Sequence, residues 1–312
     1  MPQSSHPPVF QVLARFTLAA AATLIAAAPV SATVLTATQL NVYRDGTSAD
    51  WLQGDFRLLS DSFTEGGPYV GPNFLLSSGL PSDQTSSYTL QGLAEGADAA
   101  LAVREQGGSL LLDPNYGAVS PNAQGGLGRS LRLRLQNNID PNQPNAGLPS
   151  ARSFAAALRL SLTSMPDTGE SIGFRMSDGF SNNNDVTELF VAGGALGDTI
   201  VFRTQDFLAG AITVHNTAPL VAPAGADTLV LVLSHPSANT DQIYGVYGYA
   251  DASGALMGDL TTFANPATAF RGESFTRVEL RATTTVPVPE PGTWAMFAAG
   301  LGLLLTQVRR RG

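Results

Sequence analysis

Two glutamates, Glu188 and Glu279, are the first candidates for catalytic chemistry, because each lies on an expected strand and the two could face one groove. Hydrolysis of a glycosidic bond needs two carboxyl groups about 5–10 Å apart, one of which supplies a proton. The sequence lacks a tight Glu-x-Asp-x-x-Glu group of acids. A strand glutamate that alternates with apolar residues usually lies on the solvent-facing side of its sheet. We therefore expect both glutamates on a wet surface and predict no catalytic role for them.

The chain has few residues that could carry out histidine or cysteine chemistry. It contains three histidines and no cysteine, so cysteine ligands for zinc or an iron–sulfur cluster are excluded. His215 and His235 each adjoin a turn residue at the end of an expected strand, and we expect both in loops or at the surface. A Ser-His-Asp triad needs a serine positioned beside its histidine. We predict no such serine nucleophile and no paired-histidine metal site.

The segment 178–185 is the richest in side chains that bind metal ions. It reads Asp-Gly-Phe-Ser-Asn-Asn-Asn-Asp, and its spacing differs from that of an EF-hand. Calcium takes about six to eight oxygen ligands from such loops, whereas Asn and Asp also favour turns that bind nothing. Two interpretations therefore stay open, a plain turn and a calcium site. The candidate calcium ligands are Asp178, Asn182, Asn184 and Asp185.

Four aromatic side chains, Trp51, Tyr244, Tyr247 and Tyr249, could offer flat faces to sugar rings, because aromatic rings combine an apolar body with a polar edge. Aromatic residues in strands also pack in cores and pair across strands. We favour core packing for these four residues and keep sugar stacking as the alternative.

Strands must position these residues, because apolar and polar residues alternate through the middle of the chain. Leu131, Leu133 and Leu135 alternate with two arginines, which is typical of an antiparallel strand with one wet face. Similar alternation predicts three further strands, at 158–162, 172–176 and 276–280.

Other segments predict buried strands and a hairpin. Residues 227–234 are apolar on both faces and predict a central strand, and residues 242–250 predict another. The apolar triplets 101–103 and 110–112 flank Gly107-Gly108, which favours a β-hairpin.

Roughly a dozen short strands without sustained helical periodicity predict an all-β domain over residues 33–285. So many antiparallel strands must stack or close to hide their edges, which favours an antiparallel β-sandwich or jelly roll. The domain resembles concanavalin-type jelly rolls of exported proteins in strand number and in the sequence Ile172-Gly173-Phe174-Arg175. We expect six leucines in its core: Leu131, Leu133, Leu135, Leu229, Leu231 and Leu233.

Residues 1–32 have the features of a secretory signal peptide. Arg15 precedes an alanine-rich apolar run from Phe16 to Ala28, and small residues follow at Val30-Ser31-Ala32. We predict an N-terminal signal helix, cleavage between Ala32 and Thr33, and export of the β-domain. An uncleaved N-terminal anchor is the alternative.

The charge of the predicted domain limits its partners. Residues 33–285 contain 24 acidic and 13 basic residues, a formal net charge of −11, and every basic residue of the chain is arginine. Nucleic acids and anionic membranes bind basic surfaces. We therefore expect no nucleic acid as a partner.

The C-terminal segment 286–312 combines three unlike features. A proline-rich stretch is followed by an uncharged apolar run that starts near Trp294 and by Arg309, Arg310 and Arg311. A helix over about 292–308 would be short for a bilayer core of about 30 Å, but tryptophan suits the outer interface and arginine the cytoplasmic side. We predict a single transmembrane helix there, with the three arginines as a stop-transfer signal. A buried helix of a soluble domain is the alternative.

This order of features resembles the PEP-CTERM sorting signal of bacterial surface and exported proteins, over residues 288–311. Pro289, Glu290 and Pro291 match its short motif, although Gly292 stands where serine or threonine is common. The resemblance implies an exosortase-type protease as a partner, with processing at or near this motif. It also implies an inner-membrane intermediate, then location at the cell surface or in the extracellular matrix, often with exopolysaccharide.

We therefore expect an exported, non-catalytic protein without a cofactor, in a structural or polysaccharide-associated role. The alternatives are an exported carbohydrate-active enzyme and a calcium-dependent sugar-binding module, both on a jelly roll. Two carboxyl groups with raised pKa in one groove would favour the enzyme. A cluster of oxygens around segment 178–185 would favour the calcium-dependent module.

Overall fold

The structure is a computed structural model whose described residues all belong to one part of the chain. The chain separates into two units, Met1–Ala32 and Thr33–Gly312, and every described residue lies in the second. The described residues are 34–47, 50–51, 55, 57–64, 66–68, 74–75, 87–93, 98–114, 129–136, 148–149, 152–177, 186–206, 210–236, 240, 242–268, 274–275 and 277–284.

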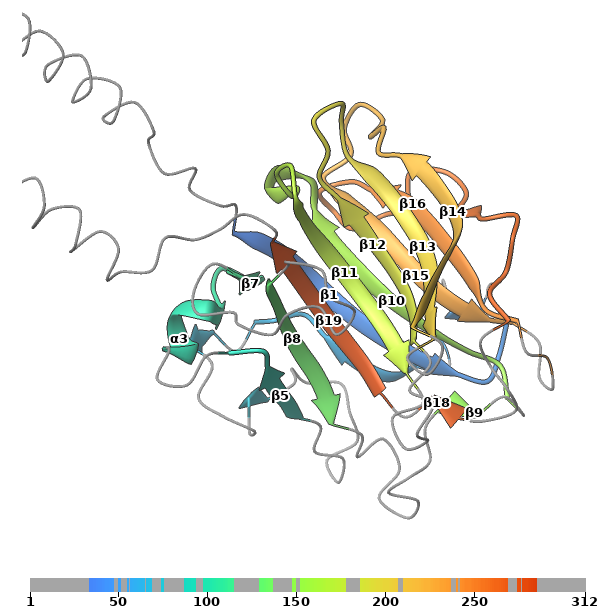
Figure 1. Cartoon of the computed structure of the whole chain (residues 1–312), viewed down its shortest axis with the longest axis horizontal. Coiled ribbons are helices and arrows are strands. Elements are labelled where there is room, and N and C mark those ends of the chain that lie inside the picture. The colour runs from blue at the N-terminus through green and yellow to red at the C-terminus, as the bar shows by residue number, and fades with distance from the viewer. Residues whose placement is uncertain are drawn as a thin grey trace, which may run out of the picture. The chain divides into compact units, whose positions relative to one another are not determined.

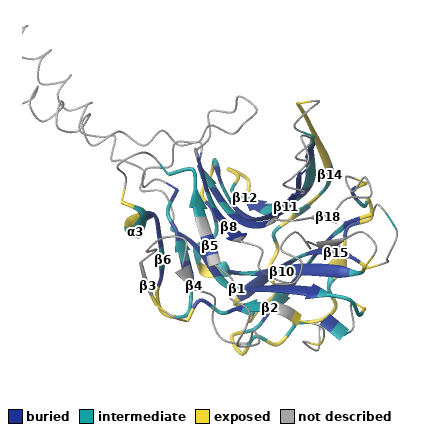
Figure 2. Ribbon diagram, turned by 90° about the horizontal axis from the view of Figure 1, so that it is seen from below, coloured by how far each residue is buried: buried dark blue, intermediate teal, exposed yellow. Residues whose placement is uncertain are grey.

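The described residues form two large antiparallel sheets, shown as two layers in Figure 2. The first, which we call sheet A, has nine strands. Their order is β17 (Thr261–Thr262), β16 (Tyr244–Ala250), β15 (Thr228–His235), β10 (Phe154–Ser161), β1 (Leu35–Arg44), β7 (Leu110–Leu112), β6 (Val103–Glu105) and β3 (Gly67–Pro68), and β2 (Arg57–Asp61) also pairs with β1.

The second, which we call sheet B, has eight strands and faces the viewer in Figure 1. Their order is β14 (Ala211–Pro219), β13 (Thr199–Asp206), β12 (Val186–Ala192), β11 (Glu170–Ser177), β19 (Arg277–Thr284), β8 (Arg129–Gln136), β5 (Ser87–Gln91) and β4 (Phe74–Leu75). Three small elements complete the description: the strand pair β18 (Ser274–Phe275) and β9 (Leu148–Pro149), the short helix α3 (Ala99–Ala102) and the 3₁₀ turn η1 (Leu162–Ser164).

The main hydrophobic core lies between the two sheets. Leu158 and Leu231 of sheet A and Phe174 and Leu280 of sheet B belong to one continuous cluster of buried side chains. All six leucines expected in the core are 0–2% exposed, which confirms that expectation. Two antiparallel sheets packed through such a core are consistent with the predicted β-sandwich.

The alternation of residue types located most of the expected strands. Strand β15 lies between β10 and β16, so the prediction of a central strand at 227–234 is confirmed. Leu162, which was expected to continue the alternation of β10, instead begins the turn η1. Ser161 ends the strand there, because its hydroxyl accepts a hydrogen bond from the Thr163 amide.

The predicted hairpin at Gly107-Gly108 is also present, over fewer residues than expected. Strands β6 and β7 pair antiparallel, and both central glycines have positive φ, 63° and 74°, as a type I′ turn requires. Leu101 and Ala102 belong to α3 instead, because the Asp98 side chain accepts the Ala100 amide and caps a helical turn.

The predictions for the two ends of the chain fall outside the described residues. These are the signal helix at 1–32 with its cleavage site Ala32–Thr33, and the sorting segment 286–312 with its transmembrane helix at about 292–308. Within the described ranges, none of the helices has the length and apolar character needed to cross a membrane.

Candidate functional site: a charged row across sheet B

Five charged side chains lie in one line across five neighbouring strands of sheet B. The strand register places Arg134 of β8 opposite Glu279 of β19, which lies opposite Arg175 of β11. Arg175 lies opposite Glu188 of β12, and Glu188 lies opposite Arg203 of β13. We call these five residues the charged row. Cations and anions alternate along it, and cross-strand partners of opposite charge stabilise a sheet.

The alternation of each strand explains why the charged row lies on one face. Side chains of a strand point alternately to the two faces of its sheet. The neighbours Leu133, Phe174, Leu189, Phe202 and Leu280 point into the core. The charged row therefore lies on the opposite face, which we call the outer face of sheet B.

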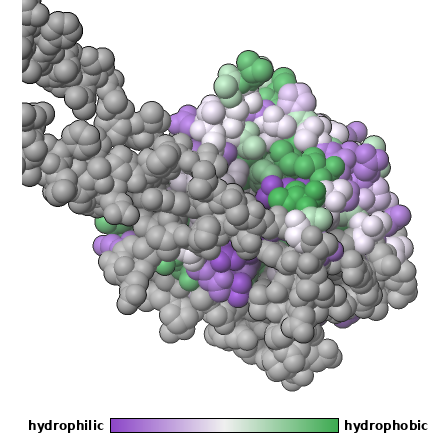
Figure 3. Space-filling view, viewed as in Figure 1, coloured by the Kyte–Doolittle hydropathy of each residue, from purple (hydrophilic) through white to green (hydrophobic). Residues whose placement is uncertain are grey.

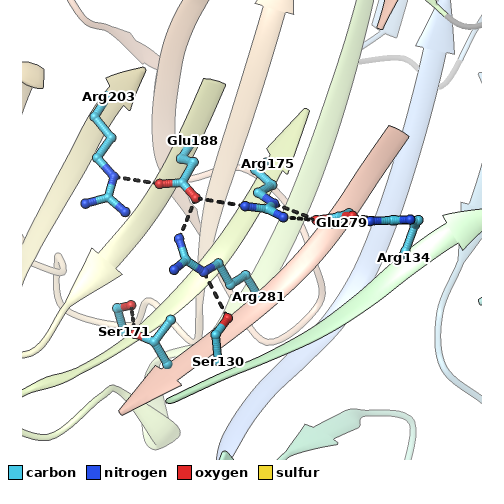
Figure 4. A network of polar contacts seen from close by, with 9 residues as sticks. Ser130, Arg134, Ser171, Arg175, Glu188, Arg203, Glu279 and Arg281 are labelled. Atoms are coloured by element: carbon cyan, nitrogen blue, oxygen red, sulfur yellow. Dashed lines mark hydrogen bonds and ion pairs between the residues drawn. The ribbon is translucent and has the colours of Figure 1, made fainter. Parts of the chain in front are cut away.

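Short contacts join every member of the charged row (Figure 4). Arg134 Nε donates to Glu279 Oε1 at 2.5 Å, and Arg175 Nε donates to Glu279 Oε2 at 2.5 Å. Arg203 Nε donates to Glu188 Oε2 at 2.6 Å, and Arg175 Nη1 lies 3.8 Å from Glu188 Oε1. Each glutamate is therefore held between two arginines of the row.

A sixth residue, Arg281 of β19, reaches the row from the next line of residues. Its Nη1 donates to Glu188 Oε1 at 2.5 Å, and its Nε donates to the Ser130 hydroxyl at 3.1 Å. The residue opposite Arg281 on β11 is Gly173, which has no side chain. Arg281 can therefore extend over β11 to a carboxylate on β12.

Both glutamates are buried, which corrects the expectation that they lie on a wet surface. Glu188 and Glu279 are each 1% exposed, and Arg175 is 6% exposed. Burial of an ion pair is unfavourable unless further hydrogen bonds satisfy its polar atoms. Here each glutamate has an arginine on both sides, so the alternating pairs make burial possible. The alternation of apolar and polar residues predicted a face opposite the core, but it did not predict that this face is buried.

The arginines hold Glu188 ionised. Burial by itself would raise the pKa of this carboxyl, but the charges of Arg281, Arg203 and Arg175 outweigh burial and lower its pKa to about 2. The pKa of Glu279 is also lowered, because Arg175 and Arg134 attract the carboxylate more strongly than burial penalises it. Two ionised carboxylates cannot supply the general acid that glycoside hydrolysis requires.

Arg132 of β8 differs from the other arginines of this face. It lies directly opposite Arg281, so two positive charges face each other across neighbouring strands. Among the described residues, its side chain has no hydrogen bond and no ion pair. Burial and the nearby charge of Arg175 lower the pKa of Arg132, although Glu279 opposes this shift.

The β13–β14 side of the outer face is apolar. Phe190 of β12 lies under the Arg203 guanidinium, with the ring centroid 4.7 Å from Cζ. Val214 of β14 lies opposite Arg203 and is 54% exposed. Figure 3 shows hydrophobic residues gathered over this part of the face and a hydrophilic area near β8. The face therefore changes from polar to apolar along the sheet.

His215 and His235 both pack within strands and contact neighbouring polar groups. His235 is fully buried at the end of β15, where its Nδ1 lies 2.8 Å from the Gln242 carbonyl oxygen, so the expectation of a surface position is wrong for this residue. Tight packing against Phe154, with ring centroids 4.8 Å apart, accounts for the burial. His215 is half-buried in β14 beside the Thr204 hydroxyl, and burial lowers its pKa.

The prediction of no serine nucleophile overlooked one pattern. Residues 169–173 read Gly-Glu-Ser-Ile-Gly and fit the Gly-x-Ser-x-Gly pattern of a nucleophile elbow. That pattern is functional on a strand-to-helix turn, whereas Ser171 lies within β11 and its hydroxyl contacts that of Thr283 at 2.5 Å. Ser171 therefore has the position of a strand residue rather than of an exposed nucleophile.

Three of the four aromatic residues considered for sugar stacking, Trp51, Tyr247 and Tyr249, take part in packing. Trp51 is 6% exposed and stacks on Tyr43, with ring centroids 6.4 Å apart. Tyr247 and Tyr249 pack against the main core, and the Tyr249 hydroxyl accepts the Val221 amide. The Tyr244 hydroxyl donates to Gln242. The packing contacts agree with the favoured interpretation for Trp51, Tyr247 and Tyr249.

The candidate calcium ligands Asp178, Asn182, Asn184 and Asp185 lie outside the described residues. Within the described ranges, no three His, Asp or Glu side chains are grouped so that they could hold a metal ion. The processing motif Pro289–Pro291 and the stop-transfer arginines Arg309–Arg311 also lie outside these ranges.

The predictions from the sequence did not include the arginines of the outer face as partners of Glu188 and Glu279. One available signal was that the chain uses only arginine as a basic residue, since the arginine fork suits buried pairs with carboxylates better than the lysine ammonium does. A second was the placement of Arg132, Arg134, Arg175 and Arg281 within alternating segments.

Comparison with known proteins gave one match, at the C-terminus. Residues 287–311 match the family model described as the PEP-CTERM protein-sorting motif. No curated protein and no solved structure matches the chain. The match covers the segment that contains Pro289, Glu290, Pro291 and the three terminal arginines, so it confirms the resemblance drawn from the sequence.

Proposed function

We propose that this protein, which carries a PEP-CTERM sorting motif at residues 287–311, is a non-catalytic structural or polysaccharide-associated protein of the cell surface or extracellular matrix. An exosortase-type protease processes it at or near Pro289-Glu290-Pro291. The signal peptide 1–32 directs export, and the segment 292–308 holds the chain in the inner membrane until processing.

The single observation that carries this proposal is the sorting motif. It joins three features with separate physical roles: a proline-rich strip that cannot enter a helix, an apolar segment, and arginines that resist transfer through hydrocarbon. The predicted export of an acidic β-domain fits a location outside the cytoplasm.

The state of Glu188 and Glu279 supports a non-catalytic role. Arginines hold both carboxyl groups ionised, whereas a glycosidase needs one protonated carboxyl group at its working pH. The charged row therefore has the chemistry of a structural or binding surface.

Processing tests the proposal in a bacterium that contains an exosortase. We expect the wild-type protein in the surface or medium fraction, with Thr33 as its N-terminus and without residues 292–312, as measured by fractionation and mass spectrometry. The Glu290→Ala variant should stay in the membrane fraction at full C-terminal length. Val288→Ala, a neighbour of the short motif, is the matched control and should be processed normally.

Two results would overturn the proposal. One is normal processing and release of Glu290→Ala, because the motif would then have no part in sorting. The other is a wild-type protein that remains in the cytoplasm with its first 32 residues intact.

A further inference from the structure

We propose that one end of the β-domain rests on the lipid surface of the membrane while residues 292–308 hold the chain there, with Leu196 and Val221 inserted among the lipids. We call this the tethered end, and it consists of four loops, at 162–169, 193–198, 220–227 and 251–260. The inference rests on the proposed function for the membrane hold, and on the described residues for the contact itself.

The strand register brings the four loops together at one end of both sheets. In sheet B, Thr199 at the start of β13 lies opposite Pro219 at the end of β14. In sheet A, Thr228 at the start of β15 lies opposite Ser161 at the end of β10 and Ala250 at the end of β16. Because the β14–β15 connection joins Pro219 to Thr228, the two sheets present these loops at the same end.

The chain leaves its last described strand at the tethered end. Thr284, the last residue of β19, lies opposite Glu170, the first residue of β11 (Figure 1). Seven residues, 285–291, separate Thr284 from the predicted membrane helix, and a chain of that length spans at most about 25 Å. An anchored chain therefore holds this end of the domain close to the bilayer.

Two neighbouring loops of the tethered end expose large apolar side chains. Leu196 is 103% exposed and Val221 is 70% exposed, more than any other large hydrophobic residue of the described ranges. The two loops lie side by side, because the Leu220 amide donates to the Asp198 carbonyl oxygen at 2.9 Å. Figure 3 shows hydrophobic residues at this end, at the top of the view. The tethered end therefore offers apolar side chains that the domain itself does not cover.

These two loops carry no polar side chain at their tips. Residues 193–197 read Gly-Gly-Ala-Leu-Gly, and residues 218–226 read Ala-Pro-Leu-Val-Ala-Pro-Ala-Gly-Ala. Most of these residues are exposed, whereas loops in contact with water are ordinarily polar. Contiguous exposed apolar surface marks sites of contact with a protein or a membrane. Here the nearby anchor favours the membrane.

The charge of the tethered end favours uncharged or zwitterionic lipid headgroups. Its loops contain five aspartates and no lysine, arginine or histidine; the aspartates are Asp167, Asp198, Asp227, Asp251 and Asp259. Arg159 of β10 contacts these loops through the Gly254 carbonyl oxygen, at 2.9 Å, so negative charge stays in excess. Anionic membranes attract basic segments and repel acidic ones. Attraction to lipid therefore comes from the apolar side chains.

The tether makes a contact of two side chains sufficient. Burial of one leucine or valine side chain favours the docked state by roughly tenfold, which is too little to hold a free domain against its lost freedom of motion. A linked anchor makes docking intramolecular and raises the effective concentration of the surface. The contact therefore orients the membrane-held domain and is lost when processing removes residues 292–312.

Lipid quenching of a fluorophore tests the proposal. The membrane-held chain is purified from a bacterium without an exosortase and reconstituted in phosphatidylcholine vesicles that contain headgroup spin labels. The chain has no cysteine, so Ala195→Cys beside Leu196 and Ala211→Cys at the far end of β14 each provide one labelling site. We expect stronger quenching of a nitrobenzoxadiazole label at the first site than at the second, and weaker quenching at the first when phosphatidylglycerol is added.

A matched pair of double variants shows which side chains make the contact. Leu196→Ser with Val221→Ser should lower the ratio of docked to undocked domains about tenfold or more, measured as lost quenching at the Ala195→Cys site. Ile212→Ser with Val214→Ser removes similar side chains from β14, which are 43% and 54% exposed, and should leave quenching unchanged. Urea unfolding checks that both variants fold, and the comparison of the two labelling sites needs neither.

Several outcomes would overturn the proposal. Equal quenching at the two labelling sites would do so, as would equal effects of the two double variants. Quenching that requires phosphatidylglycerol would contradict the role of the apolar loops, and quenching only in membranes that contain the exosortase would assign the surface to a protein partner. Flotation separates this proposal from the proposed function. A chain that floats with the vesicles without quenching refutes the contact alone, whereas a chain that does not float refutes the membrane hold and the contact with it.

Discussion

Arg281 and Glu188 form an ion pair of 2.5 Å although their strands are not neighbours, and the residues are 93 positions apart in the chain. Strand β11 lies between them. Its residue opposite Arg281 is Gly173, which has no side chain. A glycine therefore permits a contact that spans three strands of sheet B.

Gly173→Ala should destabilise the fold. An added Cβ would lie 2.4 Å from the Leu189 carbonyl oxygen and from Cα of Phe190, and these backbone atoms cannot move without disturbing β12. Overpacking of this kind costs about 1–3 kcal/mol, which a lower midpoint of urea unfolding would measure.

Gly248→Ala is the matched control for this substitution. At that strand position the added Cβ meets the end of the Leu260 side chain, at Cδ2, and that side chain can rotate away. We expect a smaller loss of stability than at Gly173. Equal losses would show that strand glycines are sensitive in general, and that the close approach of β12 to Gly173 carries no special cost.

Glu188→Gln should destabilise the fold more strongly. The neutral amide leaves Arg203, Arg281 and Arg175 without the charge that compensates their burial. Removal of one partner from a buried ion pair typically costs about 3–5 kcal/mol. Urea unfolding at pH 7 measures this loss, and Asp259→Asn at an exposed site is the control. A Glu188→Gln variant as stable as the control would mean that the charged row contributes little to stability.

Stability should fall in acid as Glu188 takes up a proton. Its pKa in the folded protein is about 2, below the value of about 4.5 that it has when unfolded. Its contribution is therefore fully present above about pH 4.5 and is lost as pH falls towards 2, by roughly 3 kcal/mol in total.

Comparison with Glu188→Gln separates the effect of Glu188 on pH-dependent stability from the effects of other acidic groups. We expect the difference in unfolding free energy between wild type and variant to shrink between pH 5 and pH 2. A constant difference across this range would contradict the lowered pKa of Glu188.

The terminal arginines should retain the unprocessed chain in the membrane. Transfer of arginine through the bilayer centre costs about 2.5–3.5 kcal/mol per residue even on insertion scales, and the alanine- and glycine-containing apolar run gives little in return. Changing Arg309, Arg310 and Arg311 to serine should therefore release unprocessed protein, measured by fractionation and immunoblotting. Changing all three to lysine keeps the charge and should leave retention intact; release of that control would show that charge is not what holds the chain.

The sequence by itself determined the class of fold and the sorting motif. Alternation with a period of two is a local property, so it located strands such as β8 and β15 and assigned Leu131 and Leu231 to the core before any pairing was known. The PEP-CTERM motif is likewise contiguous, since its proline-rich, apolar and basic parts follow one another within residues 287–311.

Only the tertiary structure decided which charged residues meet and whether their face is buried. Glu188 and Glu279 come from strands far apart in the chain, and the order β12-β11-β19 brings them to opposite sides of Arg175. Alternation shows that a strand has two faces, but strand order and packing determine what lies beside each face. For this reason the glutamates were expected in water, and the structure instead places them between arginines, with Arg132 left without a partner among the described residues.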